Sequence, residues 1–151
     1  MVWLMRLLRK DCLSALQGSL GFPEMQEDNM MMTFSLPPGV NKMYRFNRST
    51  GIMYKTREAK EWEEECLWKL KSRRKSSYSP TDRVLVSILF HFPFPEHGHK
   101  KQDIDGGIKA TLDMLQRAEI YKNDEQVDHL MVVKEYVKEN PRMEVFVEKL
   151  Q

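Results

Sequence analysis

The sequence predicts a single α/β domain of the α+β kind, in which a small mixed β-sheet packs against two main helices. Its length of 151 residues allows one domain with a real hydrophobic core and is too short for two comfortable ones. A hydrophobic fraction of 41% beside a charged fraction of 30% is typical of a globular protein. Strand and helix patterns follow in the order strand, hairpin, helix, strand, helix, strand and strand, which favours a mixed sheet covered by helices.

The beginning of the chain is set apart from the rest. Residues 1–29 have the pattern of a short amphipathic helix followed by a polar link, and Met30 looks like a second beginning. We therefore expect an N-terminal extension over 1–29, helical or loosely ordered, and a compact domain over 30–151. No window approaches the roughly eighteen apolar residues of a membrane span, and the first residues lack the apolar core of a signal peptide. The two cysteines form no disulfide framework, so we expect a cytoplasmic protein without a membrane partner.

The first half of the domain predicts a strand, a hairpin and a helix. Residues 31–36 favour a strand, which Pro37-Pro38-Gly39 closes. Residues 41–54 carry aromatic and β-favouring residues on both sides of a polar stretch, and this pattern predicts a hairpin or an Ω-type loop. Thr56 can cap a helix that runs through about Lys71, with acidic residues in its first turns and basic residues at its end.

The second half predicts a strand, a helix and two strands. Residues 83–92 form the strongest strand pattern, apolar on both faces, so we expect this strand to be central. Residues 106–118 have the apolar spacing of a helix that packs on the sheet. Residues 127–137 and 143–147 predict two strands, and we expect residues 138–141 to join them as a hairpin turn.

Three aspartates bracket the second helix. Asp103 and Asp105 precede it, and they could face one ion if the segment is extended, although Asp105 could also cap the helix. The helix is about 20 Å long and the connection after it spans about 16 Å, so Asp124 can return towards the helix start. Crowded carboxylates repel one another unless a cation holds them, and Mg²⁺ prefers oxygen ligands. The pattern predicts a metal-dependent phosphodiesterase site with Mg²⁺ or Mn²⁺, although many Asp-x-Asp pairs on surfaces bind nothing.

Lys109 lies four residues after Asp105 on the same helical face. It could contact the scissile phosphate or stabilise the charge that develops on it. The alternative is a surface ion pair with Asp105 or Asp113, which contributes little to stability.

The basic residues are clustered although the formal net charge is only +2. Basic side chains interleaved with aromatic ones suit a nucleic-acid surface, and the alternative for each cluster is a solvated face. The candidate nucleic-acid-binding residues are Lys42, Tyr44, Arg45, Arg48, Arg73, Arg74, Lys100 and Lys101.

The segment from Asp103 to Leu115, followed by residues 120–127, resembles the RusA-type Holliday-junction resolvases. The family pattern is an Asp-x-Asp-Asn start, a lysine four residues after the second aspartate, a helix that ends in Ala-Gly, and an acidic pair followed by x-Gln-Val. The resemblance covers about residues 31–149, including the opening Leu-Pro-Pro segment. It places the family's catalytic, metal-binding aspartates on Asp103, Asp105 and Asp124, and its essential lysine on Lys109.

The chain departs from the family pattern at three positions. Gly106 stands where the family usually has asparagine, which removes an amide that could orient a carboxylate or a water. Asn123 replaces the first member of the acidic pair, and Glu119 replaces the glycine at the helix end. These changes leave the three aspartates and the lysine in place.

The resemblance implies a homodimeric, Mg²⁺-dependent endodeoxyribonuclease that resolves four-way DNA junctions in recombination and repair by paired nicks. Such a phosphodiester hydrolase would use bound metal to activate water, and the two-fold symmetry of a dimer would match two equivalent strands. The alternative is a non-catalytic or broader branched-DNA-binding protein of the same fold.

Overall fold

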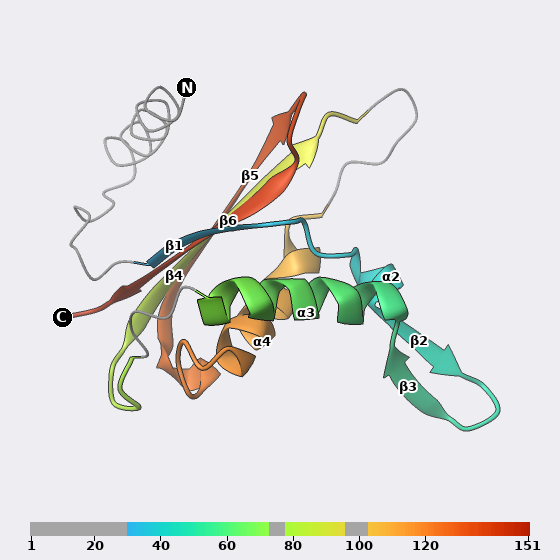
Figure 1. Ribbon diagram of the computed structural model, residues 1–151, viewed down its shortest axis with the longest axis horizontal. Helices are drawn as coiled ribbons and strands as arrows, with labels where there is room; N and C mark the ends of the chain where they lie inside the picture. The colour runs from blue at the N-terminus through green and yellow to red at the C-terminus, as the bar shows by residue number, and fades with distance from the viewer. Residues whose placement is uncertain (1–29, 73–77, 96–102) are drawn as a thin grey trace.

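The computed structural model describes residues 30–72, 78–95 and 103–151. The expectations for residues 1–29 and for Arg73, Arg74, Lys100 and Lys101 therefore lie outside the described residues. The described chain forms a mixed four-stranded sheet with two longer helices beside it (Figure 1). The sheet consists of β1 (Met30–Phe34), β4 (Val84–Pro93), β5 (Val127–Val137) and β6 (Arg142–Lys149), and the helices are α3 (Arg57–Ser72) and α4 (Ile108–Arg117). The predicted α+β class is confirmed.

The strand order is β1-β6-β4-β5, which makes β4 a central strand as its two apolar faces predict. β4 runs parallel to β5 and antiparallel to β6, and β1 pairs antiparallel with β6. The parallel pair is possible because α4 lies between β4 and β5 in the chain and supplies the crossover that parallel strands require.

The predicted hairpin between β5 and β6 is wrong. β4 lies between these strands, with Val137 beside Pro93 on one side and Arg142 beside His91 on the other. Residues 138–141 therefore cross the end of β4, and Asn140 makes the turn with a left-handed φ of 56°. The reason is that β4, buried on both faces, also needs a hydrogen-bonding neighbour at each edge, and a β5–β6 hairpin would leave one edge open.

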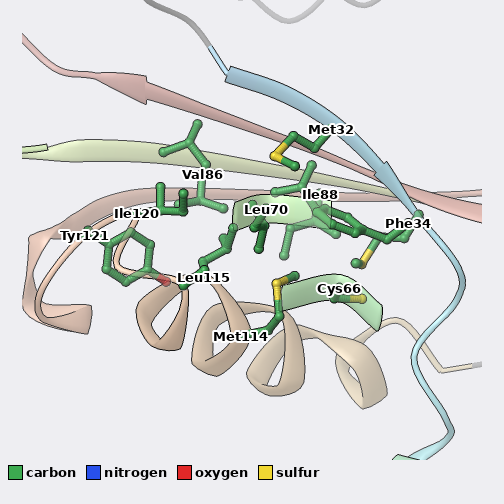
Figure 2. Close-up of a cluster of buried hydrophobic side chains, with 14 of the residues drawn as sticks. Met32, Phe34, Cys66, Leu70, Val86, Ile88, Met114, Leu115, Ile120 and Tyr121 are labelled. Carbon is green, nitrogen blue, oxygen red and sulfur yellow. The ribbon is translucent and has the colours of Figure 1, made fainter. Parts of the chain in front are cut away.

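The core lies between one face of the sheet and the two helices (Figure 2). Alternate side chains of β4 point to this face, and Val86, Ile88 and Phe90 are almost fully buried. Helix α3 contributes Cys66 and Leu70, and α4 contributes a further pair of buried side chains, Met114 and Leu115. The helical periodicity of both segments predicted these inward faces.

Helix α3 begins as predicted. The hydroxyl of Thr56 accepts a hydrogen bond from the amide of Ala59 at 3.3 Å, which caps the first turn. The indole N–H of Trp62 donates to the carbonyl of Ser35 at 3.1 Å, so the helix also holds the chain just after β1. No helix in the described parts of the chain is both long and apolar enough to cross a membrane.

The predicted hairpin at residues 41–54 is confirmed. β2 (Tyr44–Asn47) and β3 (Ile52–Lys55) pair antiparallel, and they follow a single helical turn, α2 (Val40–Met43), that the sequence did not predict. The hairpin lies next to the beginning of α3 and extends away from the sheet (Figure 1).

Glu144 on β6 makes the fold sensitive to acid. His91 Nε2 lies 3.6 Å from a carboxylate oxygen of Glu144, and Arg142 Nε donates to the same oxygen at 2.8 Å. The His91 side chain lowers the pKa of Glu144 to about 2, from an ordinary value of 4.5, with Arg142 assisting and burial opposing. A lowered folded pKa contributes stability above the unfolded value, and that stability is lost as the pH falls from about 4.5 towards 2.

We expect the free energy of unfolding to fall by about 2 kcal/mol across this pH window, after allowance for solvent screening. Glu144→Gln should remove that part of the pH dependence in denaturant unfolding followed at pH 7, 4 and 3. The control is Glu148→Gln on the same strand: burial raises the pKa of Glu148, so its protonation opposes the acid loss and its removal should not flatten the acid slope. An unchanged acid slope in Glu144→Gln would contradict the expectation.

Candidate active site

Gly107 anchors the segment that carries Asp103 and Asp105. It is buried, and a Cβ at this position would lie 2.8 Å from both the ring of Phe90 on β4 and Cγ of Pro37 after β1. Only a residue without a side chain allows the helix start to come this close to the sheet. The sequence reasoning missed this contact, and the signal that could have found it is the glycine pair immediately before a helical pattern.

The backbone at Ile104 separates the first two aspartates. Ile104 has φ −70° and ψ −33°, a helical conformation, so the segment is not extended. Residues i and i+2 share a face only on an extended strand, so the condition under which Asp103 and Asp105 could face one ion is not met at Ile104. Both carboxylates are exposed, and neither pairs with any side chain in the described chain.

The helix predicted over 106–118 begins differently in the structure. A 3₁₀ turn, η1 (Asp105–Gly107), leads directly into α4. Asp105 does not cap this turn with its side chain, so the alternative in which Asp105 caps the helix is wrong. The carboxylate lies in the first turn instead, where the partial positive charge of the helix start favours a negative group.

Asp124 begins a second 3₁₀ turn, η2 (Asp124–Gln126), which is firmly held. Asn123 and Gln126 form a capping box around it. The buried amide of Gln126 also donates to the carbonyls of Ser79 and Asp82, each at 2.8 Å. Asparagine caps a helical turn as well as aspartate does, so Asn123 can hold this turn without a carboxylate.

Tyr121 holds the connection after α4 against the helix. Its side chain is buried, and its hydroxyl donates to the carbonyl of Leu112 at 2.9 Å, which folds the connection back along α4. Burial raises the pKa of Tyr121, with smaller contributions from the charges of Asp113 and Asp124, so the phenol stays protonated and keeps this bond. The segment that leads to Asp124 therefore starts from a fixed contact with the helix.

The described residues do not gather the three aspartates into one cluster. Within residues 30–72, 78–95 and 103–151, no three Asp, Glu, His or Cys side chains are close enough to hold a metal. The donor chemistry still suits Mg²⁺, which takes one or two carboxylates and completes its coordination with waters and substrate phosphates. Exposed carboxylates that have no cationic partner among the described residues, such as Asp103 and Asp105, are donors of this type.

Lys109 lies in the first turn of α4, four residues after Asp105 and four residues before Asp113. Its ammonium group is 3.3 Å from Asp113, and 86% of its side chain is exposed. An exposed i,i+4 ion pair contributes about 0.3–0.5 kcal/mol, so Asp113 holds the lysine only loosely. The ion pair is the alternative that the sequence left open, and its weakness leaves Lys109 free to turn to a phosphate.

Four of the candidate nucleic-acid-binding residues lie together. Lys42 is in α2, Tyr44 and Arg45 are in β2, and Arg48 is in the turn that follows. All four side chains are exposed. The arginines make no ion pair with any residue that the structure describes, so their charges are available to an outside partner.

The family model described as "Endodeoxyribonuclease RusA" matches residues 36–148. The chain belongs to the RusA family. The match includes Asp103, Asp105, Lys109 and Asp124, and it begins at Leu36, at the start of the proline-rich segment that reaches Gly107. No curated protein matches the chain. The RusA match does not test the boundary between residues 1–29 and 30–151, which stays a prediction.

Glu63 connects the hairpin of this RusA-family chain to both helices. The buried carboxylate on α3 accepts hydrogen bonds from Lys55 of β3 at 2.9 and 3.1 Å, and Arg117 at the end of α4 lies 2.6 Å away. Burial raises the pKa of Glu63, but the hydrogen bonds from Lys55 and Arg117 outweigh this and hold the pKa below its ordinary value. One carboxylate thus joins three elements that are separate in the chain.

We expect Glu63→Ala to lower the free energy of unfolding by about 2 kcal/mol, because hydrogen bonds between charged groups are lost at a buried position. The loss stays moderate because Lys55 and Arg117 are partly exposed and can be hydrated. Urea unfolding at neutral pH measures it. Glu65→Ala is the matched control, since its ion pair with Lys69 is exposed on the same helix. Equal effects of the two substitutions would contradict the expectation.

Proposed function

We propose that this RusA-family protein is a metal-dependent, structure-specific endodeoxyribonuclease that resolves four-way DNA junctions by paired nicks in recombination and repair. The observation that carries the proposal is the match of the RusA family model over residues 36–148, and the exposed side chains of Asp103, Asp105, Lys109 and Asp124 within that range support it. A cytoplasmic setting is part of the proposal.

The proposed chemistry uses the polar side of α4. Asp103, Asp105 and Asp124 would offer carboxylate oxygens to Mg²⁺ or Mn²⁺, with waters and substrate phosphate as further ligands, and such an ion would supply an activated water and stabilise the leaving 3′ oxygen. Lys109 leaves its weak pair with Asp113 and donates to the scissile phosphate, where negative charge develops. Gly107 keeps the helix start against β4 and so positions the backbone that carries Asp105.

The proposed DNA contacts come from the basic residues. Lys42, Arg45 and Arg48 would neutralise backbone phosphates, with Arg73, Arg74, Lys100 and Lys101 as further candidates outside the described residues. Contacts of this kind release counterions, so binding should weaken steeply as salt rises. A homodimer would place two active sites on opposite arms of a junction with two-fold symmetry.

A cleavage assay tests the function. Synthetic four-way junction, flap and duplex DNA are incubated with the full chain in Mg²⁺ and in Mn²⁺, and the products are mapped on a denaturing gel. The proposal expects symmetric nicks in the junction and none in the duplex. Equal cutting of flaps would broaden the substrate class to branched DNA. Intact junctions under all metal conditions would contradict the enzymatic assignment.

A second candidate function is branched-DNA binding without cleavage. It is favoured by the finding that no three Asp, Glu, His or Cys side chains in the described parts of the chain are close enough to hold a metal, and by Gly106, where the family usually has asparagine. A calorimetric titration of Mg²⁺ or Mn²⁺ into the protein bound to a junction distinguishes the two candidate functions. Saturable metal binding supports the nuclease, and its absence together with tight junction binding supports the second candidate.

A further inference from the structure

The β2–β3 hairpin, residues 44–55, forms an arm with a well-defined tip. Gly51 takes a φ of 68° in the turn, and its amide donates to the carbonyl of Asn47 at 2.9 Å. The amide and the hydroxyl of Ser49 both donate to the side-chain oxygen of Asn47, at 3.0 and 2.6 Å. These bonds determine the shape of the turn and place Arg48 at the tip of the arm.

The base of the arm is fixed to the domain. An isolated two-stranded hairpin is only marginally stable in water, so outside contacts must hold it. The hydroxyl of Thr56 donates to the carbonyl of Lys42 at 2.6 Å, and its amide donates to the carbonyl of Met43 at 2.9 Å. Lys55 is bound to Glu63 on α3. These contacts attach the base of the arm to α2 and α3, and the arm extends away from the sheet (Figure 1).

Both faces of the arm present apolar side chains to solvent. Residues directly opposite in an antiparallel pair share a face. One face consists of Tyr44, Phe46, Met53 and Lys55, and the other of Arg45, Asn47, Ile52 and Tyr54. Phe46 lies opposite Met53 on the first face, and these side chains are 62% and 65% exposed. A globular protein rarely exposes neighbouring large apolar side chains unless something binds them.

The charge of the arm indicates what binds. Residues 41–56 contain four basic side chains and no aspartate or glutamate. Lys55 is neutralised by Glu63, whereas Arg45 and Arg48 have no carboxylate partner among the described residues. A second copy of the arm would bring like charges together, so self-association through this surface is disfavoured. An anionic partner with flat apolar groups fits both the charges and the aromatic rings, and nucleic acid has both.

We propose that the arm is a wedge that enters the branch point of DNA, with Phe46 and Met53 against unpaired bases and with Arg45 and Arg48 on the flanking phosphates. Apolar side chains inserted between base steps separate them, and aromatic rings stack on exposed bases without sequence preference. The inference rests on the proposed junction substrate and deepens it, because it names the part of the chain that distinguishes a branch point from duplex DNA.

The arm and the candidate active site are mechanically connected. The chain passes from Pro37, which contacts Gly107, through α2 directly into β2. At the other end, Lys55 and Arg117 share Glu63, which links the arm to the end of α4. A branch point held on the arm is therefore held at a constant position relative to both ends of the helix that carries Lys109.

The test follows base unstacking directly. A four-way junction with 2-aminopurine at the branch point is titrated with the full chain in Ca²⁺ or EDTA, so cleavage does not interfere. Wild-type protein should raise the fluorescence as bases unstack. Phe46→Ser/Met53→Ser should lose this rise and bind the junction about ten-fold or more weakly, with unchanged affinity for duplex. Phe46→Trp should keep the signal, because the larger ring still stacks.

The matched control is Trp68→Ser, which removes a 72% exposed aromatic from α3, away from the arm, and should leave every reading unchanged. Thermal melting shows that each variant is folded. A full fluorescence rise with the double variant overturns the inference. A double variant that loses a dimer but keeps the wild-type fluorescence rise and junction affinity also overturns it. If the wild-type protein unstacks bases at the junction but never cuts it, the result supports the wedge and contradicts the proposed nuclease activity.

Discussion

Asp105→Asn is expected to abolish nicking of a four-way junction by this RusA-family protein while junction binding stays intact. Asp105 lies in the first turn that leads into α4, is exposed, and has no partner among the described residues. Its loss would remove a negative ligand for the metal and leave the basic contacts of the arm unchanged. Metal stabilisation contributes several kcal/mol to such a reaction, so the rate should fall by about 1,000-fold or more.

The measurement is the single-turnover rate on a labelled junction in Mg²⁺, together with the dissociation constant in Ca²⁺. Glu65→Gln is the control, because it removes one exposed carboxylate from α3 and should cut at the wild-type rate. A rate for Asp105→Asn within about ten-fold of wild type, which is about 1.4 kcal/mol, would remove Asp105 from the proposed site.

Gly107→Ala is expected to destabilise the domain by about 2 to 3 kcal/mol, since one added methyl overpacks a close contact. The new Cβ would lie 2.8 Å from both Phe90 and Pro37, and neither ring can move away easily. Phe90 is fully buried and stacks on Phe92, and Pro37 is held in the chain between β1 and α2. The backbone must shift instead, and the shift moves Asp105 with it, so the nicking rate should also fall.

Gly39→Ala is the control for that substitution. Nothing lies within 4 Å of a Cβ at Gly39, and its φ of −57° suits any residue. The change should therefore alter the free energy of unfolding by at most about 1 kcal/mol, mainly through the start of the short α2 turn. Chemical denaturation of both variants compares them, and equal stabilities would mean that the approach at Gly107 has no energetic consequence.

The sequence predicts the chemistry of the candidate site, and the structure adds the local geometry of the segments that carry its residues. The spacing of Asp103, Asp105 and Lys109 before and within a helical pattern pointed to metal and phosphate chemistry, and the family match includes all three. Two local features shape the backbone that carries the aspartates. Ile104 adopts a helical conformation, so the first segment is not extended, and Tyr121 holds the returning chain at Leu112. Neither a backbone angle nor a distant hydrogen bond leaves a pattern in the sequence.

The sequence by itself determined the longer elements, because each of them follows a local pattern. A run of residues that is apolar on both faces marked β4 as a buried central strand, the helical spacing and Thr56 marked α3, and the polar stretch between aromatic runs marked the arm. Tertiary structure alone decided that β6 pairs with the opposite edge of β4 from β5, and that the helix start at Gly107 fits between Phe90 and Pro37. Those outcomes depend on which buried edges and surfaces remain to be satisfied once all the elements are together, and no single stretch of the chain carries that information.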